Sequence, residues 1–243
     1  MTVLVLSDIH ANLEAFEAIL AAAGAVDEVW FLGDVVGYGP NPNECVALLG
    51  SLDPAVWLAG NHDLTVVDHR QIDRFNTDAR LALEWTYRAL TDQARELLRG
   101  RSARHDWEER AVTLVHASPR SPVWEYISNA SLALENLSEF DTPLLLFGHT
   151  HVPVIYEEHV DGVLRAPPST TPLPLPTDTR WLVNPGSVGQ PRDGDPRASA
   201  LLLDLEARTL RSIRTTYDVA AVQVKIIAAG LPEKAATRLD YGW

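Results

Sequence analysis

The sequence predicts an α/β fold, a four-layer sandwich in which two mixed β-sheets pack together and helices flank them. Two features predict it: the first sixty residues alternate strand and helix patterns, and short apolar runs follow one another after residue 100. The chain has 243 residues, of which 46% are hydrophobic and 22% are charged, as in an ordinary globular protein. Because the candidate site residues are scattered along the chain, we interpret residues 1–243 as one domain.

The first sixty residues show the order strand, helix, strand, helix, strand. The apolar run Val3–Leu6 is typical of a buried parallel strand. Asn12 is a candidate helix cap, and apolar residues then recur at helical spacing as far as Gly24. The next strand, helix and strand are predicted at Glu28–Leu32, Asn43–Leu49 and Ala55–Leu58.

The rest of the chain shows a long helix and then mostly strands. The spacing predicts one helix over Thr77–Leu98, within a helical segment at about residues 70–106, and a shorter helix over Ser131–Phe140. Strands are predicted at Ala111–Val115, Leu144–Phe147, Val152–Tyr156, Trp181–Val183, Ser199–Leu203 and Leu210–Thr215. Prolines crowd residues 160–180, which we interpret as a surface loop, with a lid as the alternative.

The charge and cysteine content limit the possible partners. With 33 acidic and 20 basic residues, the formal charge of −13 argues against duplex DNA as a stable partner. A phosphorylated substrate stays open, because bound cations can reverse the local field. The single cysteine, Cys45, excludes an internal disulfide, and the N-terminus has no basic leader. We therefore expect a soluble, cytoplasmic protein without a membrane partner.

Polar side chains follow the predicted strands, at the point where each strand ends. They are Asp8, His10, Asp34, Asn61, His62, Asp63, His116, His149 and His151. Each alone has an ordinary explanation, such as a turn, a helix cap or a hydrogen-bonded histidine. Together they place five of the eight histidines at the strand ends, where ligands of open α/β sheets bind. So many hydrophilic groups in one place indicate a bound cation.

The donor types indicate which cation. Carboxylate, amide and imidazole donors without a thiolate suit Mn²⁺, Fe, Co²⁺, Ni²⁺ or Zn²⁺, whereas several histidines argue against Mg²⁺ and Ca²⁺. We expect divalent transition-metal ions, with Mn²⁺ first among them.

Five short segments in this order carry a resemblance to a known family. They are SDIHAN, GDVVGYGP, GNHD, VHAS and GHTH, which span residues 7–151. The chain resembles the calcineurin-like metallophosphoesterase superfamily. The segment Asn184–Ser199 is similar to small phosphodiesterases of this superfamily, and SPRSPVWEY suggests a bacterial branch distantly similar to diadenosine tetraphosphatases.

The resemblance implies a dinuclear metal site. It assigns one ion to Asp8, His10 and His151, and a second ion to Asn61, His116 and His149. Asp34 would bridge the two. Two such ions lower the pKa of a shared water, and the resulting hydroxide would attack phosphorus.

The resemblance also implies roles for residues outside the ligand set. His62 would be catalytic, stabilising the transition state or protonating the leaving group. Asp63 could hold the His62 ring, or it could cap the helix that follows. Arg120 and Arg192 are candidates for binding the substrate phosphate, with solvated loop arginines as the alternative.

We therefore expect a metal-dependent phosphoesterase that hydrolyses phosphodiester bonds of small substrates. The alternative is a phosphomonoesterase or a Ser/Thr phosphoprotein phosphatase, since the same metal core serves both. A nuclease is a less favoured alternative, because the net negative charge of the chain disfavours binding of a long nucleic acid. A non-catalytic scaffold of this fold is also less favoured, because such a scaffold would have lost metal ligands that are intact in this sequence. The expected partner is a small phosphorylated molecule, and the sequence leaves a homo-oligomer open.

Overall fold

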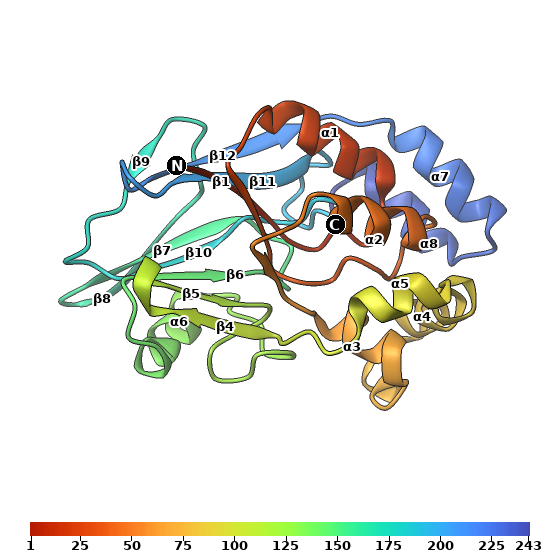
Figure 1. Cartoon of the computed structure of the whole chain (residues 1–243), viewed down its shortest axis with the longest axis horizontal. Helices are drawn as coiled ribbons and strands as arrows, with labels where there is room; N and C mark the ends of the chain where they lie inside the picture. The colour runs from red at the N-terminus through yellow and green to blue at the C-terminus, as the bar shows by residue number, and fades with distance from the viewer.

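The computed structural model describes residues 1–243 and contains two packed six-stranded sheets (Figure 1). The first sheet has the strand order β3-β2-β1-β11-β12-β9. Its strands are β1 (Thr2–Leu6), β2 (Glu28–Phe31), β3 (Val56–Trp57), β9 (Leu173–Pro174), β11 (Ala198–Asp204) and β12 (Thr209–Thr215). β1, β2 and β3 run parallel and the other pairs are antiparallel, so the sheet is mixed.

The second sheet has the strand order β4-β5-β6-β10-β7-β8. Its strands are β4 (Arg104–Trp107), β5 (Val112–Val115), β6 (Leu144–Phe147), β7 (Val154–His159), β8 (Gly162–Ala166) and β10 (Trp181–Asn184). This sheet is also mixed, with β5, β6 and β10 parallel in its centre. The predicted fold class is therefore confirmed.

Helices cover the outer faces of both sheets. They are α1 (Leu13–Ala23), α2 (Pro42–Ser51), α3 (Asn61–Asp68), α4 (Thr77–Ala89), α5 (Asp92–Leu98), α6 (Ala130–Asn136), α7 (Val219–Ala228) and α8 (Glu233–Thr237). Figure 1 shows α1 against the first sheet and α6 on the far side of the second. The side chain of Asn12 caps α1 by accepting the N–H of Ala15, as its sequence position predicted. No helix combines the length and the apolar character that crossing a bilayer requires.

The apolar residues of β1 divide between two layers of the core. Val3 and Val5 pack between the two sheets, in one cluster with Leu146 of β6. Leu4 and Leu6 point the other way, into the cluster that contains Phe16 of α1. Successive side chains of a strand alternate between its faces, so one continuous apolar run fills both layers. A third cluster joins α6 to the outer face of the second sheet.

The C-terminal helices form a separate cluster against α4. Ala82 of α4 packs there with Val222 and Ile226 of α7 and with Ala235 of α8. The sequence pattern did not predict α7 or α8. Their packing against α4 brings the end of the chain close to the loop that follows β2, because Tyr38 of that loop also contacts this cluster.

The helix predicted over Thr77–Leu98 is wrong in one respect, because the structure divides it into α4 and α5. The division falls after Ala89, and Thr91 accepts the N–H of Ala94 with its side chain. A threonine hydroxyl that satisfies a free N–H starts a new helix at that point. The predicted helical segment 70–106 also ends in a strand, since β4 begins at Arg104.

The proline-rich residues 160–180 are not entirely a loop. They contain β8 and β9, each of which lies at an edge of its sheet. Pro174 lies in β9, where only one side of the strand is paired. Proline lacks an N–H and is tolerated at such an edge, which explains how the prolines and the short strands coexist.

Candidate metal centre

The seven predicted ligands lie at the carboxyl ends of parallel strands in both sheets. Asp8 and His10 follow β1, Asp34 follows β2, Asn61 begins α3 after β3, His116 follows β5, and His149 and His151 follow β6. All seven are at most 4% exposed. The two sheets are packed together with these ends at one edge, so residues up to 143 positions apart in the chain meet there.

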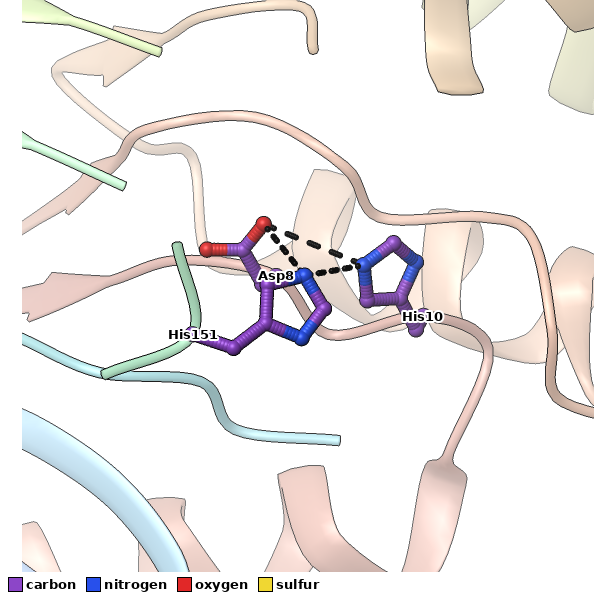
Figure 2. Close-up of side chains that lie close together, drawn as sticks. All are labelled: Asp8, His10 and His151. Atoms are coloured by element: carbon purple, nitrogen blue, oxygen red, sulfur yellow. Dashed lines mark hydrogen bonds and ion pairs between the residues drawn. The ribbon is translucent and has the colours of Figure 1, made fainter. Parts of the chain in front are cut away.

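The first set of donors is Asp8, His10 and His151 (Figure 2). The Nε2 atoms of the two histidines are 3.1 Å apart, and Oδ1 of Asp8 lies 3.3 Å from Nε2 of His151. The opposite nitrogen of each ring, Nδ1, donates to a main-chain carbonyl: His10 to Val36 at 3.0 Å and His151 to Gln190 at 2.7 Å. Each Nε2 therefore presents a lone pair, and two lone pairs face each other.

The second set of donors surrounds His116. Its Nδ1 donates to the carbonyl of Leu32 at 2.9 Å, so its Nε2 presents a lone pair as well. That Nε2 lies 3.2 Å from Oδ1 of Asn61. His116, Asp34 and His149 form a group whose donor atoms all lie within 4.8 Å of one another.

Asp34 faces both sets with the same oxygen. Its Oδ2 lies 3.8 Å from Nε2 of His10 and 3.5 Å from Nε2 of His116. Its other oxygen, Oδ1, accepts the main-chain N–H of His62 at 2.9 Å. One carboxylate thus holds the position between the sets that a shared ligand must occupy.

The donor sets fit cations because they leave acceptors without a donor. Oδ1 of Asp8 and Nε2 of His149 are buried and have no hydrogen-bond partner in the protein. A buried acceptor without a partner is costly, and a cation that accepts electron pairs from several of them removes that cost. Ligand bonds of about 2.0–2.2 Å to one ion are compatible with donor atoms 3–4 Å apart.

The backbone at the site is strained. Five of the predicted ligands have φ between 48° and 65°, in the left-handed region that residues other than glycine rarely adopt. They are Asp8, His10, Asp34, His149 and His151. These five predicted ligands are among only eleven such residues in the chain. Strain of this kind persists where surrounding contacts impose it, and it concentrates at functional sites.

Burial sets the charge of the donors. It lowers the pKa of His10 and His149 well below the ordinary value, and together with the charge of Arg192 it lowers that of His151 to about 4. Burial raises the pKa of Asp34, and the charges of Asp63 and Asp8 raise it further. The imidazoles are therefore neutral at pH 7, the form that binds a metal ion, and a bound cation would offset the burial that raises the pKa of Asp34.

His62 differs from the other histidines of the site. It lies within reach of His10 and Asp34, yet its Nδ1 is buried without a hydrogen-bond partner. Its ring packs against the rings of Tyr38 and Phe75, with centroids 4.7 and 4.9 Å apart. Nothing in the protein fixes the tautomer of this imidazole.

Asp63 does not hold the His62 ring. Its carboxylate accepts four main-chain N–H groups, from Asp34, Val35, Val36 and Gly60. The first three belong to the loop that carries Asp34, and the fourth lies at the start of α3. The predicted catalytic role of Asp63 is thus not supported by the geometry, whereas the alternative, a helix-terminal carboxylate, agrees with it.

The two predicted substrate-binding arginines have different surroundings. Arg192 lines the cavity at the metal centre, donates to Gln190 Oε1 at 2.9 Å and has a buried Nε without a partner. Arg120 does not line this cavity. Its guanidinium forms ion pairs with Glu125 and Glu135, and we do not propose it further as a substrate ligand.

The cavity has a volume of about 150 Å³ and aromatic walls that the sequence analysis did not single out. Tyr126 stacks on His149 with ring centroids 4.0 Å apart, and Phe75 and Trp124 meet edge to face. Tyr38, Trp124 and Tyr126 belong to the segments GDVVGYGP and SPRSPVWEY. Those segments carried the resemblance, so they contained a signal for the cavity wall as well.

Known proteins are similar to this chain in sequence and in fold. The profile of the Calcineurin-like phosphoesterase superfamily domain matches residues 1–208. An uncharacterized protein of Methanocaldococcus jannaschii is 33% identical, over 98% of this chain and 97% of its own. The crystal structure of a metallophosphoesterase from Sphaerobacter thermophilus is 43% identical with a TM-score of 0.91, and covers 100% of this chain and 99% of that one. A symmetrical bis(5′-nucleosyl)-tetraphosphatase of Pseudomonas entomophila is 30% identical over 56% of this chain, but only 48% of that protein is covered.

The matched profile contains every loop that carries a predicted ligand, from Asp8 to His151. The geometry of those loops independently calls for cations bound by carboxylates and imidazoles. Sequence, fold and donor chemistry agree, and the chain belongs to the calcineurin-like phosphoesterase superfamily as a metallophosphoesterase, a hydrolase of phosphoric esters.

Proposed function

We propose that this metallophosphoesterase hydrolyses phosphodiesters of small molecules with two divalent transition-metal ions, Mn²⁺ first among them. One ion would be held by Asp8, His10 and His151, the other by Asn61, His116 and His149, with Asp34 shared. The observation that carries this assignment is the position of Asp34 Oδ2, which faces an unprotonated Nε2 of each set.

The cavity supports a small diester as substrate. Four aromatic side chains line it, namely Tyr38, Phe75, Trp124 and Tyr126. A phosphate with two organic substituents can place each of them against these side chains. The acidic charge of the chain disfavours a long polyanion.

When bound, the ions would supply an activated water at neutral pH and positive charge for the phosphate oxygens. The chain itself supplies the other functions. Arg192 lines the cavity and keeps a donor, Nε, without a partner, so its guanidinium can bind a phosphate oxygen. His62, whose ring nitrogen has no partner, can hold a proton beside the leaving oxygen or stabilise charge there.

The test compares esters of one chromophore on the metal-loaded protein. We expect kcat/KM for bis(p-nitrophenyl) phosphate to exceed that for p-nitrophenyl phosphate at least tenfold with Mn²⁺, Fe, Co²⁺, Ni²⁺ or Zn²⁺. A preference for the monoester, or for a phosphoserine peptide, would instead support the phosphomonoesterase or phosphoprotein phosphatase alternative. Asp34→Asn is the control for contaminating activity, because it should lose turnover with every metal.

A further inference from the structure

A second cavity adjoins the cavity at the metal centre. It has a volume of about 180 Å³ and shares Tyr38, Asn76, Tyr126 and Arg192 with the first. Its remaining lining residues are Asp78 of α4, Lys234 and Ala235 of α8, and Arg238 directly after α8. The two cavities therefore form one continuous surface, on which Arg192 lies at the junction.

Two arginines in this second cavity are held by a neutral group. Nη2 of Arg192 and Nη1 of Arg238 donate to the same oxygen, Oε1 of Gln190, at 2.9 and 3.0 Å. Arg238 also donates from Nε to the main-chain oxygen of Trp243. Neither guanidinium forms an ion pair with an Asp or Glu side chain. Burial and the charge of Arg192 lower the pKa of Arg238 to about 10, so Arg238 is still charged at pH 7.

What sets Arg192 and Arg238 apart is that they share one neutral acceptor. Arg120, Arg180 and Arg197 each donate to a carboxylate instead. Two guanidinium groups that converge on one amide oxygen repel each other, and Nε of Arg192 is buried without any partner. An anion between them would remove both costs.

The other charged side chains that line this cavity are Lys234 and Asp78. Lys234 lies 3.8 Å from Asp78, and both side chains are well exposed. A pair so exposed is weak and can open when a stronger anion binds. The cavity as a whole thus has three cations and one carboxylate.

We propose that Arg238 and Lys234, with Arg192 at the junction, form a subsite for a second phosphate group of the substrate. The preferred substrate is then a small phosphodiester that carries an additional phosphomonoester. Lys234 and Arg238 follow residue 208, where the matched family profile ends, and their position depends on the packing of α7 and α8 against α4. This inference rests on the proposed function, since it places the reacting phosphate at the metal centre.

The subsite can be tested by binding, without turnover. The probes are thymidine 5′-monophosphate and thymidine 3′,5′-bisphosphate, which differ by one phosphate group, titrated calorimetrically into the Mn²⁺-loaded protein. We expect the bisphosphate to bind at least about tenfold more tightly, the scale of one charged hydrogen-bonded contact. Arg238→Gln should reduce this advantage to about twofold, and Lys234→Gln should reduce it by a smaller factor.

The matched control is Arg88→Gln, because Arg88 is an exposed arginine of α4 outside both cavities. It should retain the full advantage of the bisphosphate. A merely structural effect of Arg238→Gln would weaken both probes equally, whereas loss of the subsite weakens only the bisphosphate. If Arg238→Gln does not fold, the exposed Lys234 variant still decides the question.

Equal or undetectable binding of the two probes by the unmodified protein would overturn the subsite. An advantage that survives in both Arg238→Gln and Lys234→Gln would overturn it as well. The proposed function is tested separately by bis(p-nitrophenyl) phosphate, which has no second anionic group. Failure to hydrolyse that diester, with the bisphosphate advantage intact, would refute only the diesterase function.

Discussion

The histidines of the metal centre differ in how their far nitrogen is held. His10, His116 and His151 each donate Nδ1–H to a main-chain carbonyl, at 3.0, 2.9 and 2.7 Å. His62 lies in the same cavity and is equally buried, but its Nδ1 has no partner. Its ring is positioned only by packing against aromatic neighbours, among them Tyr38.

This difference separates two kinds of chemistry. A main-chain carbonyl fixes the tautomer, so that Nε2 permanently presents a lone pair, as a metal ligand must. A ring without such a bond can gain, lose or redirect a proton during a reaction. We infer that His10, His116 and His151 are ligands and that His62 acts on the substrate, and the following variants test this division. His149 stands outside this comparison: its ring stacks on Tyr126, and its assignment as a ligand rests on its grouping with Asp34 and His116.

The largest effect is expected for Asp34→Asn, which changes the oxygen that faces both sets. An amide at this position removes the negative charge, and its NH₂ group can donate to the lone pair on Nε2 of His10 or His116 that would otherwise bind an ion. We expect the variant to lose bound metal and kcat to fall about 10⁴-fold or more, since the ions supply several kcal/mol of charge stabilisation. Elemental analysis and kcat on the same sample measure this, and full metal content with normal turnover would contradict a shared ligand.

His62→Ala should leave the metal content unchanged. We expect kcat to fall roughly 10²–10³-fold for diesters with a poor leaving group, within the usual range for acid–base catalysis. The loss should be smaller for p-nitrophenolate, which needs little protonation as it departs. A loss that is independent of the leaving group would indicate charge stabilisation, and a loss of metal would place His62 among the ligands.

Gly37→Ala should disturb His62 without touching a ligand. A Cβ at Gly37 would overlap Nδ1 of His62, and the φ of +91° there is unfavourable for alanine. We expect kcat to fall about tenfold, less than for His62→Ala, because the displaced ring can still reach the substrate in part. Metal content should stay unchanged.

Gly194→Ala is the matched control for that variant. Gly194 has a φ of +84° but nothing within 4 Å of the added Cβ. The left-handed backbone should cost both alanine variants stability in thermal unfolding, of order 1 kcal/mol, and Gly37→Ala should lose more because the buried His62 ring must move. Only Gly37→Ala should lose turnover, and an equal loss in both would mean that displacement of His62 is not the cause.

The positions of the predicted ligands at the sheet edge were predictable because they depend on local order along the chain. A side chain that follows a buried strand lies at the sheet edge, so Asp8, Asp34 and His116 could be placed from apolar runs alone. The fold class was predictable for the same reason. The predicted helix over Thr77–Leu98 was wrong because the cap at Thr91 competes with a continuous apolar pattern.

Contacts between distant segments could not be read from the sequence. Asp63 and His62 are neighbours in the chain, yet the Asp63 carboxylate binds the loop of Asp34 instead of the His62 ring. The packing of α7 and α8 places the basic side chains Lys234 and Arg238 in the second cavity, next to the metal centre. No sequence motif predicted this position. Such partners depend on three-dimensional packing and not on spacing in sequence.

The smallest effects are expected at the two arginines, where the same distinction between fixed and free donors applies. In Arg120 all three guanidinium nitrogens donate to Glu125 or Glu135, whereas Arg192 keeps a buried Nε without a partner. Arg192→Gln should raise KM for bis(p-nitrophenyl) phosphate about tenfold with a smaller change in kcat, as for a lost charged contact to bound substrate. Arg120→Gln should change kcat/KM by no more than about twofold, because exposed ion pairs contribute little. Steady-state kinetics on both variants measure the contrast, and a larger loss at Arg120 than at Arg192 would show that unused donors do not identify the substrate ligand.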